Sequence, residues 1–84
     1  MITIEFKLYS DGSRAWYLDG RYHRDNDLPA VIYPNGTKNW YQKGKRHRDN
    51  NQPATIRNDG SKMWYQNDKL LIQAKSLDCV KESK

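Results

Sequence analysis

The chain is built on an internal repeat with a 24-residue period. Gly12, Gly36 and Gly60 share this spacing, as do Trp and Tyr residues at two adjacent positions: Trp16, Trp40, Trp64, Tyr17, Tyr41 and Tyr65. Self-similarity at a fixed period of this length indicates a repeat architecture, in which each unit contacts only its neighbours. The sequence therefore predicts a fold that grows by adding units side by side.

The 84 residues form one repeat domain in this interpretation. Residues 1–10 are an N-terminal half-repeat strand, 11–34 the first repeat, 35–58 the second, 59–72 a partial capping repeat, and 73–84 a short helix and tail. The third unit has Leu71 and Ile72 where the earlier units have His23-Arg24 and His47-Arg48. Such a loss is typical of a terminal unit, which has no successor to contact.

Turn-forming pairs divide each unit into short segments. Pairs such as Asp11-Gly12, Asp19-Gly20 and Asn35-Gly36 follow one another at spacings that alternate between 8 and 16, and they favour hairpin turns. Alternation within the shorter interval puts Trp16 and Tyr17 on opposite faces of a strand. We therefore predict an all-β fold: a single-layer antiparallel β-meander of about two and a half 24-residue repeats, with a short C-terminal helix over residues 73–82.

One point of this topology stays open at the level of sequence. The segments Arg21–Arg24 and Lys45–Arg48 follow a turn in each repeat, and spacing does not decide whether they pair as separate strands.

Composition excludes several classes of protein. Hydrophobic residues make up 36% of the chain, and its longest aliphatic run is Leu70-Leu71-Ile72, far short of the roughly 20 residues of a membrane-spanning helix. The N-terminus has no basic and apolar segments of a secretory signal. The single cysteine, Cys79, cannot form an internal disulfide. We therefore expect a cytoplasmic protein without a membrane partner.

The repeated unit resembles a known pattern. The run Lys43-Gly44-Lys45-Arg46-His47, followed by Asn58-Asp59-Gly60-Ser61 and Trp64, is similar to the MORN-like repeats of bacteriophage and giant-virus proteins, over residues 6–72. The resemblance implies a single-layer antiparallel sheet and a binding role without catalysis. Arg24 and Arg48 stand where ordinary MORN units have a second glycine, which argues against lipid binding. A viral origin would place the protein in the host cytoplasm, acting on a host factor.

The recurring polar residues do not form a catalytic or metal site. His23 and His47 lie one full repeat apart without cysteines or clustered carboxylates, which is a poor spacing for metal ligands, and no nucleophile recurs beside them. We predict no catalytic, cofactor-binding or metal-ligating residue. The repeated positions are interpreted as structural, with tryptophans as a thin core and histidines bonded to neighbouring turns: Trp16, Trp40, Trp64, His23, His47, Gly12, Gly36 and Gly60.

The net charge of +5 is concentrated in the second repeat. Residues 35–58 hold six basic residues and one acidic residue, a surplus equal to that of the whole chain. Positions that differ between repeats are the better candidates for function, because a scaffold alone does not need the difference. At three such positions the first repeat has Asp19, Tyr22 and Tyr33, and the second repeat has Lys43, Arg46 and Arg57. The competing interpretation is a solvated basic face that only aids solubility.

Two partners fit this basic and aromatic composition. The first hypothesis is RNA or single-stranded nucleic acid, bound through phosphate contacts and base stacking, as in a phage counter-defence factor that inhibits a host toxin or nuclease. The alternative is an acidic host protein, such as that toxin or nuclease, bound without nucleic acid through a sheet face or edge strand. Uncovered sheet edges also favour a homodimer. The predicted contact residues are Lys38, Tyr41, Lys43, Lys45, Arg46, Arg48, Arg57, Lys62 and Tyr65.

Overall fold

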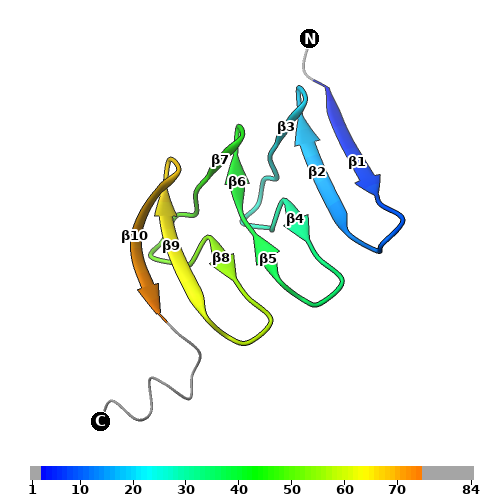
Figure 1. Cartoon of the computed structure of the whole chain (residues 1–84). Coiled ribbons are helices and arrows are strands. Elements are labelled where there is room, and N and C mark those ends of the chain that lie inside the picture. The colour runs from blue at the N-terminus through cyan, green and yellow to red at the C-terminus, as the bar shows by residue number, and fades with distance from the viewer. Residues whose placement is uncertain (1–2, 75–84) are drawn as a thin grey trace.

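The computed structural model describes residues 3–74, which form an antiparallel β-sheet (Figure 1). The predicted all-β antiparallel fold is confirmed. Its strands are β1 (Ile4–Leu8), β2 (Arg14–Leu18), β3 (Arg21–Tyr22), β4 (Val31–Ile32), β5 (Lys38–Asn39), β6 (Tyr41–Gln42), β7 (Lys45–Arg46), β8 (Thr55–Ile56), β9 (Lys62–Gln66) and β10 (Lys69–Ala74).

The strands follow one another across the sheet almost in chain order. The main path is β1-β2-β4-β5-β8-β9-β10, β3 pairs with β2, and β6 pairs with β7 as a separate ribbon. Figure 1 shows the strands side by side in one twisted layer. The question left open by the sequence is thereby answered. Arg21-Tyr22 and Lys45-Arg46 pair as short strands. The His23 and His47 N–H groups still donate to the carbonyls of Trp16 and Trp40, and the chain leaves the sheet after these residues.

Backbone conformation explains why the turns lie where they do. At the hairpin tips both central residues have positive φ, as at Asp19-Gly20, Lys43-Gly44 and Asn67-Asp68. This is the type I′ geometry that matches the twist of paired strands. The loops after the histidines use the same region at Asn26-Asp27 and Asn50-Asn51, because Asn and Asp tolerate it better than other side chains with a Cβ atom.

Each histidine joins its own unit to the turn of the next unit. The Lys43 N–H donates to Nδ1 of His23 at 2.9 Å, and the Asn67 N–H donates to Nδ1 of His47 at 3.1 Å. Because Nδ1 accepts, the ring proton lies on Nε2, which is bonded to Asp25 in His23 and to Asp49 in His47. The same bonds therefore recur from one repeat to the next.

The buried interior of the sheet is thin. The hydrophobic residues with less than a tenth of their surface exposed are Ala15, Ala30, Val31, Trp40, Ala54 and Met63. Trp16 and Trp64 are only half-buried. Of the three tryptophans predicted to form the core, only Trp40 is therefore buried. Arginine side chains cover two of the indoles: Arg24 Cζ lies 3.6 Å from the Trp16 ring centroid and Arg48 Cζ 3.8 Å from that of Trp40.

The C-terminal helix prediction is wrong for Gln73 and Ala74, and the rest of the predicted helix lies outside the described residues. These two residues belong to β10, where Gln73 and Ala74 pair with Met63 and Lys62 of β9. Leu71 and Ile72 offer no imidazole to bind a following turn and no guanidinium to hold a loop, so the chain continues as a strand. A β-bulge interrupts this pairing between Leu70 and Ile72. Residues 3–74 contain no helix long and apolar enough to span a membrane.

Arg48 binds the loop of the preceding repeat as well as its own. Its Nε and Nη2 donate to the two carboxylate oxygens of Asp27 at 2.8 and 3.2 Å, and its Nη1 donates to the Pro53 carbonyl at 3.0 Å. Arg24 makes the equivalent bond to the Pro29 carbonyl, but no preceding loop supplies it with a carboxylate in the described structure.

We expect Arg48→Met to destabilise the fold more than Arg24→Met. The additional cost is about 1 kcal/mol, because a charged hydrogen-bonded pair is lost but Asp27 is 50% exposed and partly screened by water. Urea unfolding of the two variants measures this difference. Equal midpoints for the two would show that the Asp27 pair contributes nothing to stability.

The same pair predicts a loss of stability in acid. The hydrogen bonds from Arg48, helped by its charge, hold the pKa of Asp27 below the ordinary value of 3.8. A carboxyl group with a lowered pKa in the folded chain stabilises the fold above its unfolded pKa, and this contribution is lost as pH falls below 3.8 through the folded value. Urea unfolding between about pH 2 and 5 is therefore expected to be less pH-dependent in Asp27→Asn than in the wild type. An identical acid dependence in both proteins would contradict this assignment.

Candidate nucleic-acid interface

All six tyrosines of the chain lie on one face of the sheet. Alternation along the strands puts Tyr17 and Tyr41 opposite to the adjacent tryptophans. Tyr22 pairs with Tyr17 across β2 and β3, and Arg46, which pairs with Tyr41 across β6 and β7, shares their side. We call this the tyrosine face and the opposite side the tryptophan face.

The tyrosine face is built from three repeated positions. Each position occurs three times at the 24-residue spacing, which gives a grid of six tyrosines, two arginines and one leucine. Leu70 belongs to this grid because it pairs with Tyr65 across β9 and β10. The three rows are Tyr9, Tyr33 and Arg57; Tyr17, Tyr41 and Tyr65; and Tyr22, Arg46 and Leu70.

The aromatic rings touch one another across the strands. The hydroxyls of Tyr9 and Tyr17 are hydrogen-bonded. The ring centroids of Tyr17 and Tyr22 lie 5.1 Å apart, and those of Tyr22 and Tyr41 lie 4.9 Å apart. The hydrogen bond to Tyr9, together with burial, raises the pKa of Tyr17, and burial raises the pKa of Tyr33. These phenols are therefore neutral at physiological pH and add no negative charge to the face.

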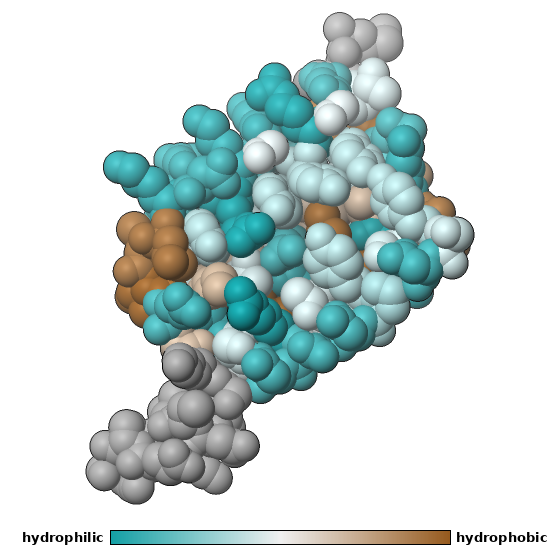
Figure 2. Space-filling model, in the orientation of Figure 1, coloured by the Kyte–Doolittle hydropathy of each residue, from teal (hydrophilic) through white to brown (hydrophobic). Residues whose placement is uncertain are grey.

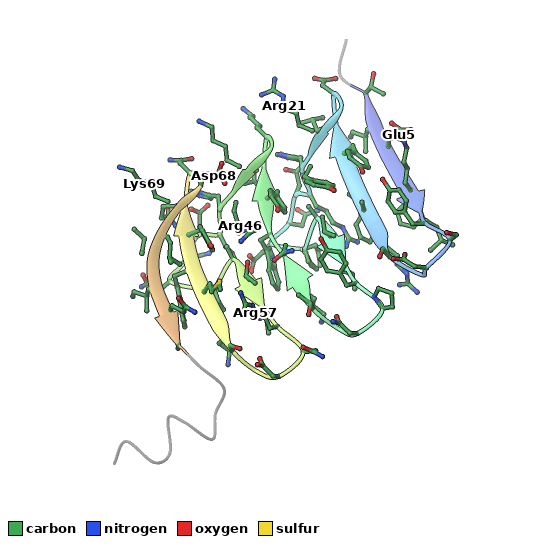
Figure 3. The ribbon with its side chains drawn as sticks, in the orientation of Figure 1. Glu5, Arg21, Arg46, Arg57, Asp68 and Lys69 are labelled. Carbon is green, nitrogen blue, oxygen red and sulfur yellow. The ribbon has the colours of Figure 1, made fainter. Side chains whose placement is uncertain are left out.

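Arg46 and Arg57 supply positive charge within this aromatic surface. Arg46 Cζ lies 4.7 Å from the Tyr65 ring centroid and 5.6 Å from that of Tyr41, and its Nη2 donates to the Tyr41 hydroxyl at 3.2 Å. Arg57 is exposed, and its Nη2 lies 3.9 Å from the Met63 sulfur. Figure 3 shows both arginines over the middle of the sheet, whereas Glu5 lies at its β1 edge. Arg46 is thus held between two tyrosine rings, and Arg57 adds an exposed charge on the same face.

A second group of basic residues lines the hairpin tips. Arg21, Lys45 and Lys69 follow the three type I′ turns at the 24-residue spacing, and Lys43 lies within the central turn. All four are exposed, beside the exposed acids Asp19 and Asp68. Figure 3 labels Arg21, Asp68 and Lys69 along this edge. The sequence interpretation missed Arg21 and Lys69, although their spacing was a usable signal.

The predicted contact residues are therefore distributed over four places. Tyr41, Tyr65, Arg46 and Arg57 lie on the tyrosine face, and Lys43 and Lys45 at the tips. Lys38 and Lys62 pair with Ile56 from opposite sides and share the tryptophan face. Arg48 is only 13% exposed and bound to Asp27, so its guanidinium does not belong to the interface. Among the predicted contact residues of the second repeat, a continuous surface is therefore formed only by those on the tyrosine face and those at the adjoining hairpin tip, Lys43 and Lys45.

No protein-family model, curated protein or solved structure matches this chain. Within residues 3–74 no group of three or more His, Cys, Asp or Glu side chains is placed to hold a metal ion.

Lys43 occupies a backbone conformation that its side chain does not favour. Its φ is 52°, and the equivalent positions in the other units are Asp19 and Asn67, which tolerate positive φ better. We expect Lys43→Asn to raise the free energy of unfolding by about 0.5 kcal/mol, since the N–H bond to His23 is kept. If this tip contacts nucleic acid, the variant is also expected to bind RNA more weakly. Thermal unfolding and an RNA titration test the two effects. Unchanged binding would remove Lys43 from the interface.

Proposed function

We propose that this chain is a non-enzymatic binding protein of MORN-like repeats whose tyrosine face binds RNA or single-stranded nucleic acid. The observation that supports this most directly is the gathering of all six tyrosines on one side of the sheet, with Arg46 and Arg57 among them. A scaffold role alone does not require these two arginines, because the first repeat has Tyr22 and Tyr33 at the same positions.

The chemistry of this face matches that of unpaired nucleotides. Aromatic rings stack on bases of any sequence, at about 1–3 kcal/mol per base. Arginine adds phosphate contacts and stacks on bases as well. Tyr9 and Tyr33 are 42% and 40% exposed, and they border an open hollow that also includes Tyr22 and Val31. This hollow gives an unstacked base a place against ring surfaces.

The resemblance to viral MORN-like repeats supports a setting for this activity. In a phage, a small RNA-binding protein of this kind would serve as a counter-defence factor in the host cytoplasm. It would inhibit a host toxin or nuclease that itself acts on RNA, by occupying the RNA or the enzyme–RNA complex.

The experiment that tests this function compares single-stranded RNA with a duplex of the same sequence. Fluorescence anisotropy is expected to give tighter binding to the single strand, because bases in a duplex are already stacked and present no free ring faces. Equal affinity for both forms would leave only phosphate contacts and contradict the role of the tyrosines.

The second candidate partner is an acidic host protein that docks on the same face. Tyrosine and arginine are enriched among the residues that dominate protein interfaces, and Tyr33 and Arg57 are both exposed there. Affinity purification with and without ribonuclease separates the two candidates. A protein partner that survives digestion favours direct recognition, whereas loss of every partner favours RNA.

A further inference from the structure

Strand β1 leaves one edge of the sheet open. Within residues 3–74 it pairs only with β2, and all five of its residues are exposed. Ile4, Phe6 and Leu8 keep 74%, 50% and 65% of their surface exposed. An exposed apolar edge strand is a template for pairing with another strand.

The free backbone groups of this edge can be assigned to particular residues. The Asp19 N–H donates to the Thr3 carbonyl, and the Tyr9 N–H donates to the Ser13 carbonyl, both at 2.8 Å. Because bonding alternates along an antiparallel strand, the odd-numbered residues from 3 to 9 bond towards β2. The N–H and C=O groups of Ile4, Phe6 and Leu8 therefore point away from the sheet.

We propose that β1 pairs with β1 of a second copy of this chain, antiparallel and centred on Phe6. The sequence Ile4-Glu5-Phe6-Lys7-Leu8 is complementary to itself in this register. Phe6 lies opposite Phe6 of the second copy, Ile4 opposite its Leu8, and Glu5 opposite its Lys7. The outward backbone groups fall at the hydrogen-bonded positions, and the Glu–Lys pairs at the non-bonded positions, where side chains are closest.

The other sheet edge does not fit a second copy equally well. Successive strands on the main path are antiparallel, and β1 and β10 are its first and seventh members, so they run in the same direction. Pairing of β10 with β1 of an identically oriented copy would be parallel, which is less stable per residue. Strand β10 also has a bulge between Leu70 and Ile72, a feature that blunts an edge against pairing. Figure 2 shows the apolar patch over β10, where Leu70, Leu71 and Ile72 are exposed. These three residues carry no charges that could form ion pairs like those of Glu5 and Lys7.

The dimer would extend the sheet with both tyrosine faces on the same side. Glu5 pairs with Tyr17 across β1 and β2, so Glu5 and Lys7 lie on the tyrosine face, and their partners in the second copy must share that side. A five-residue strand pair buries less than a standard interface of roughly 1,200–2,000 Å². We therefore expect a weak, concentration-dependent dimer, whether or not the chain binds RNA.

Sedimentation velocity over a range of protein concentrations tests this pairing. Glu5→Lys alone, or Lys7→Glu alone, puts like charges opposite each other twice per dimer and is expected to weaken dimerisation about tenfold or more. The double variant Glu5→Lys/Lys7→Glu restores opposite charges in both pairs, so it is expected to dimerise like the wild type. Circular dichroism melting checks that the three variants are folded.

A matched change at the other edge serves as the control. Leu70→Lys adds a charge to β10 and is expected to leave the dimer intact. A monomeric wild type at millimolar concentration would overturn the proposal. So would single charge variants that dimerise normally, a double variant that is not restored, or a dimer that is lost in Leu70→Lys.

Discussion

Replacing Trp40 by alanine is expected to cost about 3–5 kcal/mol of folding free energy. Trp40 is 7% exposed. Its indole N–H donates to the Asp27 carbonyl at 3.0 Å, and the Arg48 guanidinium lies over its ring. The substitution thus removes a buried side chain that joins two repeats. The loss is a large fraction of the stability of a chain of this size, about 4–12 kcal/mol, so circular dichroism should show a much lower melting temperature than that of the wild type.

Trp64 provides the matched comparison. Its indole N–H makes the equivalent bond to the Asn51 carbonyl at 2.9 Å, but it is half-buried, and Ile72 lies opposite it on β10. Trp64→Ala is therefore expected to destabilise the fold less than Trp40→Ala. If the two variants melted at the same temperature, the central tryptophan would not be the main link between repeats.

The second large effect concerns binding. The double variant Arg46→Ala/Arg57→Ala removes the two arginines of the tyrosine face. In the proposed complex each arginine contacts one phosphate group. Without both arginines, the slope of the logarithm of affinity against the logarithm of salt concentration is expected to become shallower by about 1.4 for a single strand. Affinity at low salt should fall by roughly a hundredfold if each arginine contributes about 1.4 kcal/mol. Anisotropy titrations with a labelled single-stranded RNA measure both quantities.

A control with the same charge change lies on the opposite side of the sheet. Lys38→Ala/Lys62→Ala removes two cations from the tryptophan face and is expected to leave the salt dependence near that of the wild type. Equal losses in the two double variants would mean that only net charge matters and that the tyrosine face is not the binding surface.

Repeat spacing made much of the fold predictable. Turn pairs at fixed intervals located the hairpins, and alternation separated Trp16 from Tyr17. The repeat spacing did not predict that β10 continues beyond residue 72. The apolar residues Ala74, Leu77 and Val80 follow one another at three-residue steps, and this pattern favoured a helix. The strand is instead determined by its pairing with β9, a tertiary contact that local pattern does not contain.

The candidate interface was predictable only in part. The differences between Tyr22 and Arg46, and between Tyr33 and Arg57, marked two of the three positions that form the tyrosine face. The sequence also places Arg48 on this surface, because Arg48 is basic and follows Lys43, Lys45 and Arg46 closely along the chain. Its internal role depends on Asp27 in the preceding repeat, and this contact follows from how adjacent repeats are stacked.

The most direct test of the proposed function is the affinity of the wild-type chain for single-stranded RNA at two salt concentrations. The four cations Arg46, Arg57, Lys43 and Lys45 predict a slope of about −2.8. Between about 50 and about 200 mM salt the affinity should therefore fall roughly fiftyfold. Absence of binding at the lower concentration, or an affinity that does not change with salt, would contradict recognition of RNA by this face.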